Sequence, residues 1–324
     1  MQRVTSADVA LRAGVSRATV SYVLNETPGQ SISPATRTRV LAAAASLGYA
    51  PSAAARTLRT GRSDVVLCLL PDWPIGNEVG NLLGNLSTEL ARAGMTFVVH
   101  PGSEADRPAG EIWKAITPAA VITFAGFSDG ELGAMRAAGV AVVVALLGGP
   151  GREGCELQMP QQLVGRHQAQ HLRGTGHSRL GYAYPDDERL RIFADPRLAG
   201  VRASTPEDPV VETVPLDPDR AAGAVRRWRA VGVTGVCAYN DEVALAVLAG
   251  ARLLGVAVPG ELAVVGVDDI PAARLAVPPL TTVTTDQRAI AAHLAAGVLA
   301  AISGKPEPLP PGGDAIRVIS RASA

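Results

Sequence analysis

The chain has 324 residues, and 47% of them are hydrophobic, which excludes a disordered protein. The charges of its 30 basic and 30 acidic side chains cancel, which excludes a uniformly charged protein. The length exceeds what one compact core usually holds, and more than one domain is expected. No uninterrupted apolar run reaches the roughly 18 residues of a membrane span, and no export signal opens the chain, so we expect a cytoplasmic protein without membrane contact.

The chain opens with two predicted short helices. Thr5 stands three residues before Asp8 in a capping-box arrangement, which predicts a helix that runs to Ala13 and ends at Gly14. A second helix is predicted over Ser16–Leu24, with the serine as its cap. The tight turn between the two helices contains a glycine, as helix-turn-helix motifs often do.

A third helix completes the pattern. Ser33 is its expected cap, Pro34 suits its first position, and Gly48 lies just past its end. Apolar residues repeat along one face of this helix at Val40, Ala44 and Leu47. Three short helices of this kind predict a helix-turn-helix domain.

The second helix has two faces. At 100° per residue its packing face holds Val20, Val23 and Leu24, and its free face holds Arg17, Ala18, Ser21 and Tyr22. Arg17, Ala18 and Tyr22 can donate to guanine or touch thymine methyl groups in the major groove of DNA. The alternative is a solvated face on a small helical domain.

Charge favours the DNA-binding alternative. Residues 1–62 contain eight arginines against Asp8 and Glu26, a net charge of +6, and the remainder of the chain carries −6. Contact with phosphate groups is the natural use of such a basic segment.

A short alanine-rich segment follows. Ser52 can cap a helix that ends at Gly61, and so short a helix is marginal on its own in water. Leu58 lies between Arg56 and Arg59, a pattern suited to minor-groove insertion, with the leucine as a wedge and the arginines on phosphates. A plain linker would more often be rich in glycine and serine or in proline.

The remaining residues alternate between apolar runs and helical stretches, which predicts parallel sheets with helices on both faces and an α/β body of two lobes. Helices are expected over stretches such as Gly84–Ala93 and Asp241–Leu254. The predicted strands are Val65–Leu70, Phe97–Val99, Val121–Phe124, Val140–Leu147, Leu180–Tyr184, Val210–Val214, Val236–Ala238, Leu262–Val267 and Ala315–Ile319.

Sheets of this kind bind ligands at the carboxyl ends of their strands. The residues at these positions are Asp72, Trp73, Asn240, Asp241, Asp268 and Asp269. For Asp241 we favour a role as cap of the following helix. Trp73 either covers a strand end or stacks on a ligand, and the sequence favours neither.

Catalysis and cofactors are not indicated. The three cysteines, Cys68 and Cys237 in predicted strands and Cys155 in a predicted loop, lack the spacing of metal ligands. No Ser/His/Asp order, P-loop or dinucleotide fingerprint is present. We therefore expect no enzyme, no cofactor and no metal.

Several motifs together resemble the lac-repressor (LacI/GalR) family of bacterial transcriptional regulators, over essentially the whole chain. They are Val4-Thr-Ser-Ala-Asp-Val-Ala10, Ala13-Gly-Val-Ser16, Thr19-Val-Ser21, Leu24-Asn25, Gly48-Tyr-Ala-Pro51 and the segment around Leu58. The resemblance implies an N-terminal all-α helix-turn-helix headpiece (1–50), a hinge helix and linker (51–63) and a two-lobed, periplasmic-binding-protein-like core (64–324). Lobe 1 is expected over 64–158 and 286–312, and lobe 2 over 159–285 and 313–324.

For DNA, the resemblance implies base reading by Arg17, Ala18 and Tyr22, although many members have arginine where Tyr22 stands. It implies wedging by Leu58, which stands two residues after Arg56. Contacts with the DNA backbone are implied for Thr5, Ser16, Ser21, Asn25, Ser33, Thr36 and Tyr49.

For an effector, the resemblance implies polar contacts from Arg197, Asn240 and Asp268. These residues add to Asp72 and Trp73, which are candidates because they follow a predicted strand. A guanidinium, an amide and a carboxylate can bind vicinal hydroxyls or a purine edge, so a sugar or a nucleoside is expected. The alternatives are a surface salt bridge for Arg197 and a turn for Asp268. This chain departs from common family residues at Pro160-Gln161, Pro218 and Gln287.

The resulting expectation is a repressor that binds a near-palindromic operator as a dimer and responds to a small molecule. A dimer is expected rather than a tetramer, since no heptad repeat follows the last strand. Two alternatives stay open: the same regulator without a small-molecule effector, under protein control or constitutive, and a pure small-molecule-binding protein.

Overall fold

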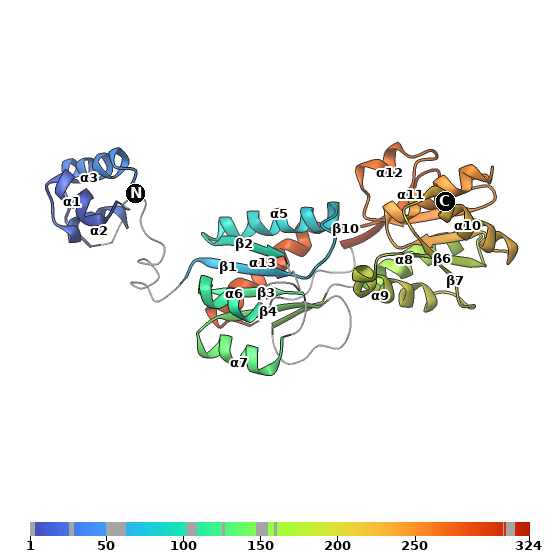
Figure 1. Ribbon diagram of the computed structural model, residues 1–324, viewed down its shortest axis with the longest axis horizontal. Helices are drawn as coiled ribbons and strands as arrows, with labels where there is room; N and C mark the ends of the chain where they lie inside the picture. Colours follow the sequence, from blue (N-terminus) through green and yellow to red (C-terminus); the bar gives the residue numbers. More distant parts are fainter. Residues whose placement is uncertain are drawn as a thin grey trace. The chain divides into compact units, whose positions relative to one another are not determined.

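The computed structural model describes residues 4–25, 29–49, 63–101, 109–124, 127–146, 155–158, 161–306, 308 and 315–324. They belong to two compact units, residues 1–64 and 65–324 (Figure 1). The predicted hinge helix with Arg56 and Leu58 lies outside the described residues.

The first unit, the head, contains three helices, and each packs against the other two: α1 (Ser6–Ala13), α2 (Arg17–Leu24) and α3 (Pro34–Ser46). One valine from each helix, Val9, Val20 and Val40, is completely buried at the centre. The three helices confirm the predicted ones.

The predicted caps are also present in the head. The backbone N–H and hydroxyl of Thr5 both donate to the Asp8 carboxylate, at 2.8 and 2.7 Å. The Ser16 hydroxyl accepts from the N–H of Thr19 at 3.1 Å, and Ser33 caps α3 in the same way. These bonds satisfy donors that a helix leaves free at its first turn, so the helix starts are fixed locally.

The second unit, the body, contains two sheets. The first sheet is entirely parallel, in the order β2-β1-β3-β4-β5. Its strands are β1 (Val65–Leu70), β2 (Thr96–Pro101), β3 (Ala120–Thr123), β4 (Ala141–Leu146) and β5 (Cys155–Gln158). Its helices are α5 (Asn77–Arg92), α6 (Ala109–Ile116), α7 (Asp129–Ala137) and α13 (Gln287–Ser303). We call this part lobe 1.

Helices cover both faces of the first sheet. Leu86 of α5 and Leu294 of α13 pack on the face that holds Val66, while Met135 of α7 packs on the opposite face with Leu67. Neighbouring strand residues thus point into different helix layers, as in other doubly covered parallel sheets.

The second sheet has the order β11-β10-β9-β8-β6-β7, parallel except for β11, which is antiparallel to β10. Its strands are β6 (Leu180–Pro185), β7 (Val210–Val214), β8 (Gly235–Ala238), β9 (Ala263–Val267), β10 (Thr281–Thr285) and β11 (Ile316–Ile319). The helices are α8 (Gln161–Gly174), η1 (Glu188–Leu190), α9 (Arg191–Arg202), α10 (Pro218–Ala230), α11 (Asp241–Leu253) and α12 (Pro271–Leu275). We call this part lobe 2.

The chain passes between the lobes more than once. Helix α13 directly follows β10 of lobe 2 but packs against α5 and β4 of lobe 1, and β11 then lies in the sheet of lobe 2 (Figure 1). Residues far apart in sequence therefore meet where these segments cross.

The α/β architecture with parallel sheets confirms the predicted fold class, and four details differ. Strands β5 and β10 were not predicted, and Cys155 begins β5 instead of lying in a loop. Helix α5 begins at Asn77 rather than Gly84 because Leu82 and Leu86 bury the same face one turn apart. In the part of the chain that the structure describes, no helix is long and apolar enough to cross a membrane.

Candidate nucleic-acid interface and ligand pocket

Helix α2 presents three side chains away from the core of the head. Val20 and Val23 are at most 1% exposed, whereas Arg17 and Ala18 are exposed and Tyr22 is 37% exposed. The buried valines and the Ser16 cap hold the helix, and its opposite face is free. The residues predicted to read bases thus share one accessible face.

The residues predicted to contact the DNA backbone fall into two groups. Thr5, Ser16 and Ser33 lie at the starts of the three helices, with Thr36 in the first turn of α3, where backbone N–H groups favour phosphate. Ser21, Asn25 and Tyr49 also support the head itself. The Asn25 amide donates to the Ser21 carbonyl oxygen at 2.6 Å, and Tyr49 packs on the helical core.

A pocket of about 400 Å³ lies between the two lobes of the body. Lobe 1 contributes Trp73 and Glu78, and lobe 2 contributes Phe193, Arg197, Tyr239, Asn240, Glu242 and Asp268, among others. We call it the interlobe pocket. It combines aromatic walls with a few polar groups, as small-molecule sites do.

Arg197 is buried at this pocket, with only 8% of its surface exposed. Its Nε donates to Gln161 Oε1 and its Nη1 to the Tyr239 carbonyl oxygen, both at 2.8 Å. The guanidinium also lies over the Tyr239 ring, 5.0 Å from the ring centre, and 3.8 Å from the Asp268 carboxylate. A surface salt bridge, the alternative considered for Arg197, is therefore wrong.

The loop after β9 separates two neighbouring carboxylates. Asp268 and Asp269 have φ angles of 110° and 51°, which non-glycine residues rarely adopt. Asp268 lines the interlobe pocket, whereas Asp269 accepts hydrogen bonds from Arg321 and Arg274. Burial raises the pKa of Asp268, and the charge of Arg197 opposes that rise. No donor in the described part of the chain bonds the Asp268 carboxylate, which leaves it able to accept from a ligand.

The structure corrects the assignment at the start of α11. Asn240 is the cap, because its Oδ1 accepts from the Val243 N–H at 2.9 Å, so the predicted capping role of Asp241 is wrong. Asp241 is completely buried and accepts from the Ile270 N–H and the Thr282 hydroxyl, at 2.9 and 2.6 Å. Burial raises its pKa to about 7. Asn240 still lines the pocket, with its side-chain oxygen already engaged.

Trp73 and Asp72 are neighbours in sequence, but their side chains have different surroundings. Trp73 is 9% exposed and packs against Phe124 of lobe 1 and Phe193 of lobe 2, with ring centres 5.2 and 4.7 Å apart. It covers a strand end and lines the pocket at once. The Asp72 side chain is 63% exposed, lies 3.5 Å from Arg189, and does not line the pocket.

Sequence reasoning missed the partners of the pocket residues. Gln161, noted only as a departure, accepts from Arg197, and Gln287, noted in the same way, donates to Glu78. Burial raises the pKa of Glu78. Tyr239 directly precedes the predicted Asn240 at the end of β8, so its position at a strand end was the signal that could have identified it.

A helix-turn-helix head in one chain with a two-lobed body that holds a pocket between its lobes is the architecture of a ligand-responsive regulator of transcription. The family described as "Bacterial regulatory proteins, lacI family" matches residues 5–52, and the "Periplasmic binding protein-like domain" matches residues 169–324.

Similar proteins agree over nearly the whole length. The transcriptional regulator CelR of Thermobifida fusca is 31% identical over 94% of this chain and 93% of its own, and GalS of Salmonella typhimurium is 30% identical over 86% and 84%. The lac repressor dimer bound to operator and an anti-inducer superposes with a TM-score of 0.79, at 23% identity and 99% coverage of both chains. A CelR–cellobiose complex gives 0.66 at 27% identity, covering 99% of this chain and all of the other.

The chain belongs to the lacI family of bacterial regulatory proteins. It is a DNA-binding transcriptional regulator with a helical head and an α/β body. Its relatives named above are regulators of transcription and not enzymes.

Proposed function

We propose that this protein acts in the cytoplasm as a repressor that binds a near-palindromic operator as a dimer. Binding of a small molecule between the lobes raises or lowers its affinity for the operator. The observation that carries the DNA part is the free face of α2, where Arg17, Ala18 and Tyr22 stand opposite the buried Val20 and Val23. Two such heads read two half-sites related by a twofold axis.

Selection of bound duplexes from a random DNA pool tests the proposed DNA reading. We expect a near-palindrome for the unchanged protein. Arg17→Ala should relax the preference at one base pair in each half-site by about 1–3 kcal/mol, since one base contact is lost. Arg39→Ala, an exposed arginine on α3, is the matched control and should leave every base preference unchanged. No twofold-symmetric sequence in the selected pool would overturn the proposal.

For the hinge segment, which lies outside the described residues, we retain the sequence-based proposal that Leu58 is a wedge. Leu58→Ala should weaken specific operator binding much more than non-specific binding at the same salt concentration. Equal losses on both duplexes would exclude the wedge.

The interlobe pocket supports a small, hydroxylated effector. Its aromatic walls can cover a sugar or nucleoside ring, and the Asp268 carboxylate can accept from ligand hydroxyls. The solved CelR relative binds cellobiose. In a thermal-shift screen of neutral sugars and nucleosides, the true effector should raise the melting temperature, and Arg197→Ala should abolish that shift. A shift that survives Arg197→Ala would place the ligand elsewhere.

A regulator without a small-molecule effector is the second candidate. Arg197 already has Gln161, the Tyr239 carbonyl and Asp268 as partners, so its guanidinium is engaged without a ligand. A negative outcome of the ligand screen, together with operator binding, would favour this candidate.

A further inference from the structure

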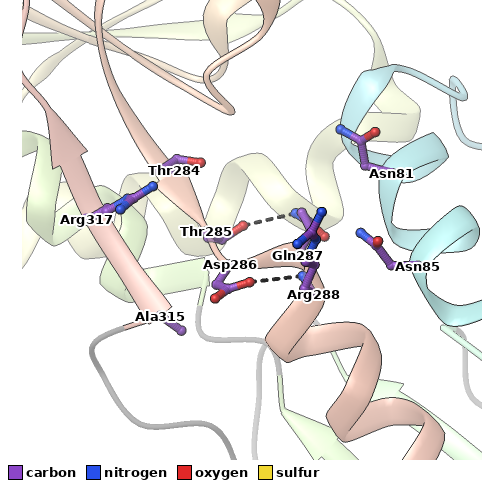
Figure 2. A pocket seen from close by; sticks show the side chains of 9 residues that line it. All are labelled: Asn81, Asn85, Thr284, Thr285, Asp286, Gln287, Arg288, Ala315 and Arg317. Atoms are coloured by element: carbon purple, nitrogen blue, oxygen red, sulfur yellow. Dashed lines mark hydrogen bonds between the residues drawn. The ribbon is translucent and has the colours of Figure 1, made fainter. Parts of the chain in front are cut away.

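The body contains a second hollow, of about 490 Å³, where the chain crosses between the lobes (Figure 2). We call it the crossover pocket. Its polar lining includes Asn81 and Asn85 of α5, Thr284 and Thr285 of β10, Arg288 of α13 and Arg317 of β11. Helix α5 belongs to lobe 1, and β10 and β11 belong to lobe 2, so both lobes contribute to the pocket.

The lining of the crossover pocket is basic. It contains two guanidinium groups, Arg288 and Arg317, against the single carboxylate of Asp286. One oxygen of that carboxylate caps α13, because Asp286 Oδ1 accepts from the N–H groups of Arg288 and Ala289, each at 3.0 Å. Neither guanidinium has an ion pair or a hydrogen bond in the described part of the chain. Two unpaired guanidiniums at one concave surface suit an anionic group.

The interlobe pocket has the opposite balance. Its lining has three acidic side chains, Glu78, Glu242 and Asp268, and the single guanidinium of Arg197, which already has partners within the protein. An anion is therefore expected to prefer the crossover pocket.

Hydroxyl-binding groups lie beside the two arginines. Figure 2 shows the Asn85 side chain directed toward the start of α13, where Gln287 and Arg288 lie. The Asn85 amide has no hydrogen-bond partner in the described part of the chain. Gln287 Oε1 is buried and likewise has no partner there, so it is an acceptor that a ligand hydroxyl could satisfy. A hydroxylated anion would use these groups together with the arginines.

A hydrogen bond links a side chain of one pocket to a side chain of the other. Glu78 lines the interlobe pocket, and it accepts a hydrogen bond from Gln287, which lines the crossover pocket. A ligand that draws the Gln287 amide away would change the hydrogen bonding of Glu78.

We propose that the crossover pocket is a second ligand site, distinct from the interlobe pocket, for a small hydroxylated anion such as a phosphorylated or carboxylated sugar. The guanidiniums bind the anionic group, and the asparagine, threonine and glutamine side chains bind the hydroxyls. A ligand held by α5 and by β11 contacts both lobes, and its binding therefore depends on their arrangement.

Isothermal titration of the full chain tests this site, with ribose 5-phosphate as the probe and ribose as its uncharged counterpart, in phosphate-free buffer. We expect saturable binding of ribose 5-phosphate and no binding of ribose. The double variant Arg288→Gln/Arg317→Gln should bind it roughly tenfold or more weakly, since two charge-assisted hydrogen bonds are lost. The matched control is Arg226→Gln/Arg252→Gln, which removes two exposed arginines outside the pocket. It should bind like the unchanged protein.

Arg197→Ala separates the two pockets and should leave ribose 5-phosphate binding unchanged. Asn85→Leu supplies a second variant that keeps every charge and should also weaken the binding. The proposal is overturned if ribose 5-phosphate does not bind, if its binding survives in the double variant, or if Arg197→Ala removes it. None of these measurements involves DNA or the unknown effector, so failure of this site and failure of the proposed function are distinguishable.

Discussion

At the scale of single residues, burial decides the chemistry of Asp241. This carboxylate is completely buried between α11 and β10, with the Thr282 hydroxyl and the Ile270 N–H as donors. An added Cβ at Gly266 would approach Asp241 Oδ1 to 2.1 Å, which leaves no room for water beside it. Loss of solvation outweighs the two hydrogen bonds, and the pKa of Asp241 rises to about 7.

This pKa predicts a pH-dependent stability. An unfolded aspartate titrates near 3.8, so between about pH 4 and pH 7 the unfolded chain has lost a proton that the folded protein keeps. Protons then favour the fold, and Asp241 makes the free energy of unfolding fall as the pH rises through this range. Asp241→Asn should lose less stability than the unchanged protein between pH 5 and pH 8, as measured by urea denaturation.

The control for this measurement is Asp208→Asn, because the Asp208 side chain is 80% exposed. It should follow the pH profile of the unchanged protein. Parallel profiles for Asp241→Asn and the unchanged protein would show that this carboxylate is not the titrating group.

At the scale of secondary-structure elements, the crossing of α8 and α9 positions Arg197. An added Cβ at Gly165 would approach the Arg197 carbonyl oxygen to 1.9 Å, and one at Gly200 would approach the Gln162 carbonyl oxygen to 2.0 Å. The two helices are thus in backbone contact at their glycines. This close approach brings Gln161 of α8 within hydrogen-bond distance of Arg197 of α9.

Gly200→Ala should therefore destabilise the body by about 1–3 kcal/mol or more, since the helices must move apart to admit the methyl group. It should also weaken binding of any ligand that depends on Arg197. Gly133→Ala is the matched control: it lies in helix α7 with nothing within 4 Å of an added Cβ. There alanine should be neutral or stabilising, by up to about 1 kcal/mol. Equal melting temperatures for the two variants would contradict the tight crossing.

At the scale of the whole molecule, two exposed side chains are candidates for the proposed dimer contact. Leu275 and Val277 are 82% and 78% exposed in the single chain. Large apolar side chains this exposed are costly in water, and a second copy of the chain is the partner that the proposed function requires.

Leu275→Glu/Val277→Glu should shift the protein toward the 33.3 kDa monomer in sedimentation velocity, because a symmetric contact would bury two added carboxylates from each copy against those of the other. Operator binding should weaken in parallel. Leu216→Glu, at a leucine that is 66% exposed, is the control and should leave the mass unchanged. A monomeric unchanged protein, or a double variant that stays dimeric, would exclude this surface.

The sequence alone determined features that depend on near neighbours. The starts of α1, α2 and α3 follow from hydrogen bonds that span three residues, as between Ser16 and Thr19. The two faces of α2 and most strands follow from short-range periodicity, and a correct order of apolar and helical stretches then predicts the α/β fold.

Only the tertiary structure decided the contacts between distant segments. Strand β10 has the sequence Thr-Thr-Val-Thr-Thr, without an apolar run, and is a strand because its neighbours β9 and β11 bond it. Arg197 meets Gln161 across 36 positions, and Gln287 meets Glu78 across 209. Which partner a buried polar group finds depends on packing within lobe 2 for Arg197 and on packing between the lobes for Gln287, and no local pattern encodes either.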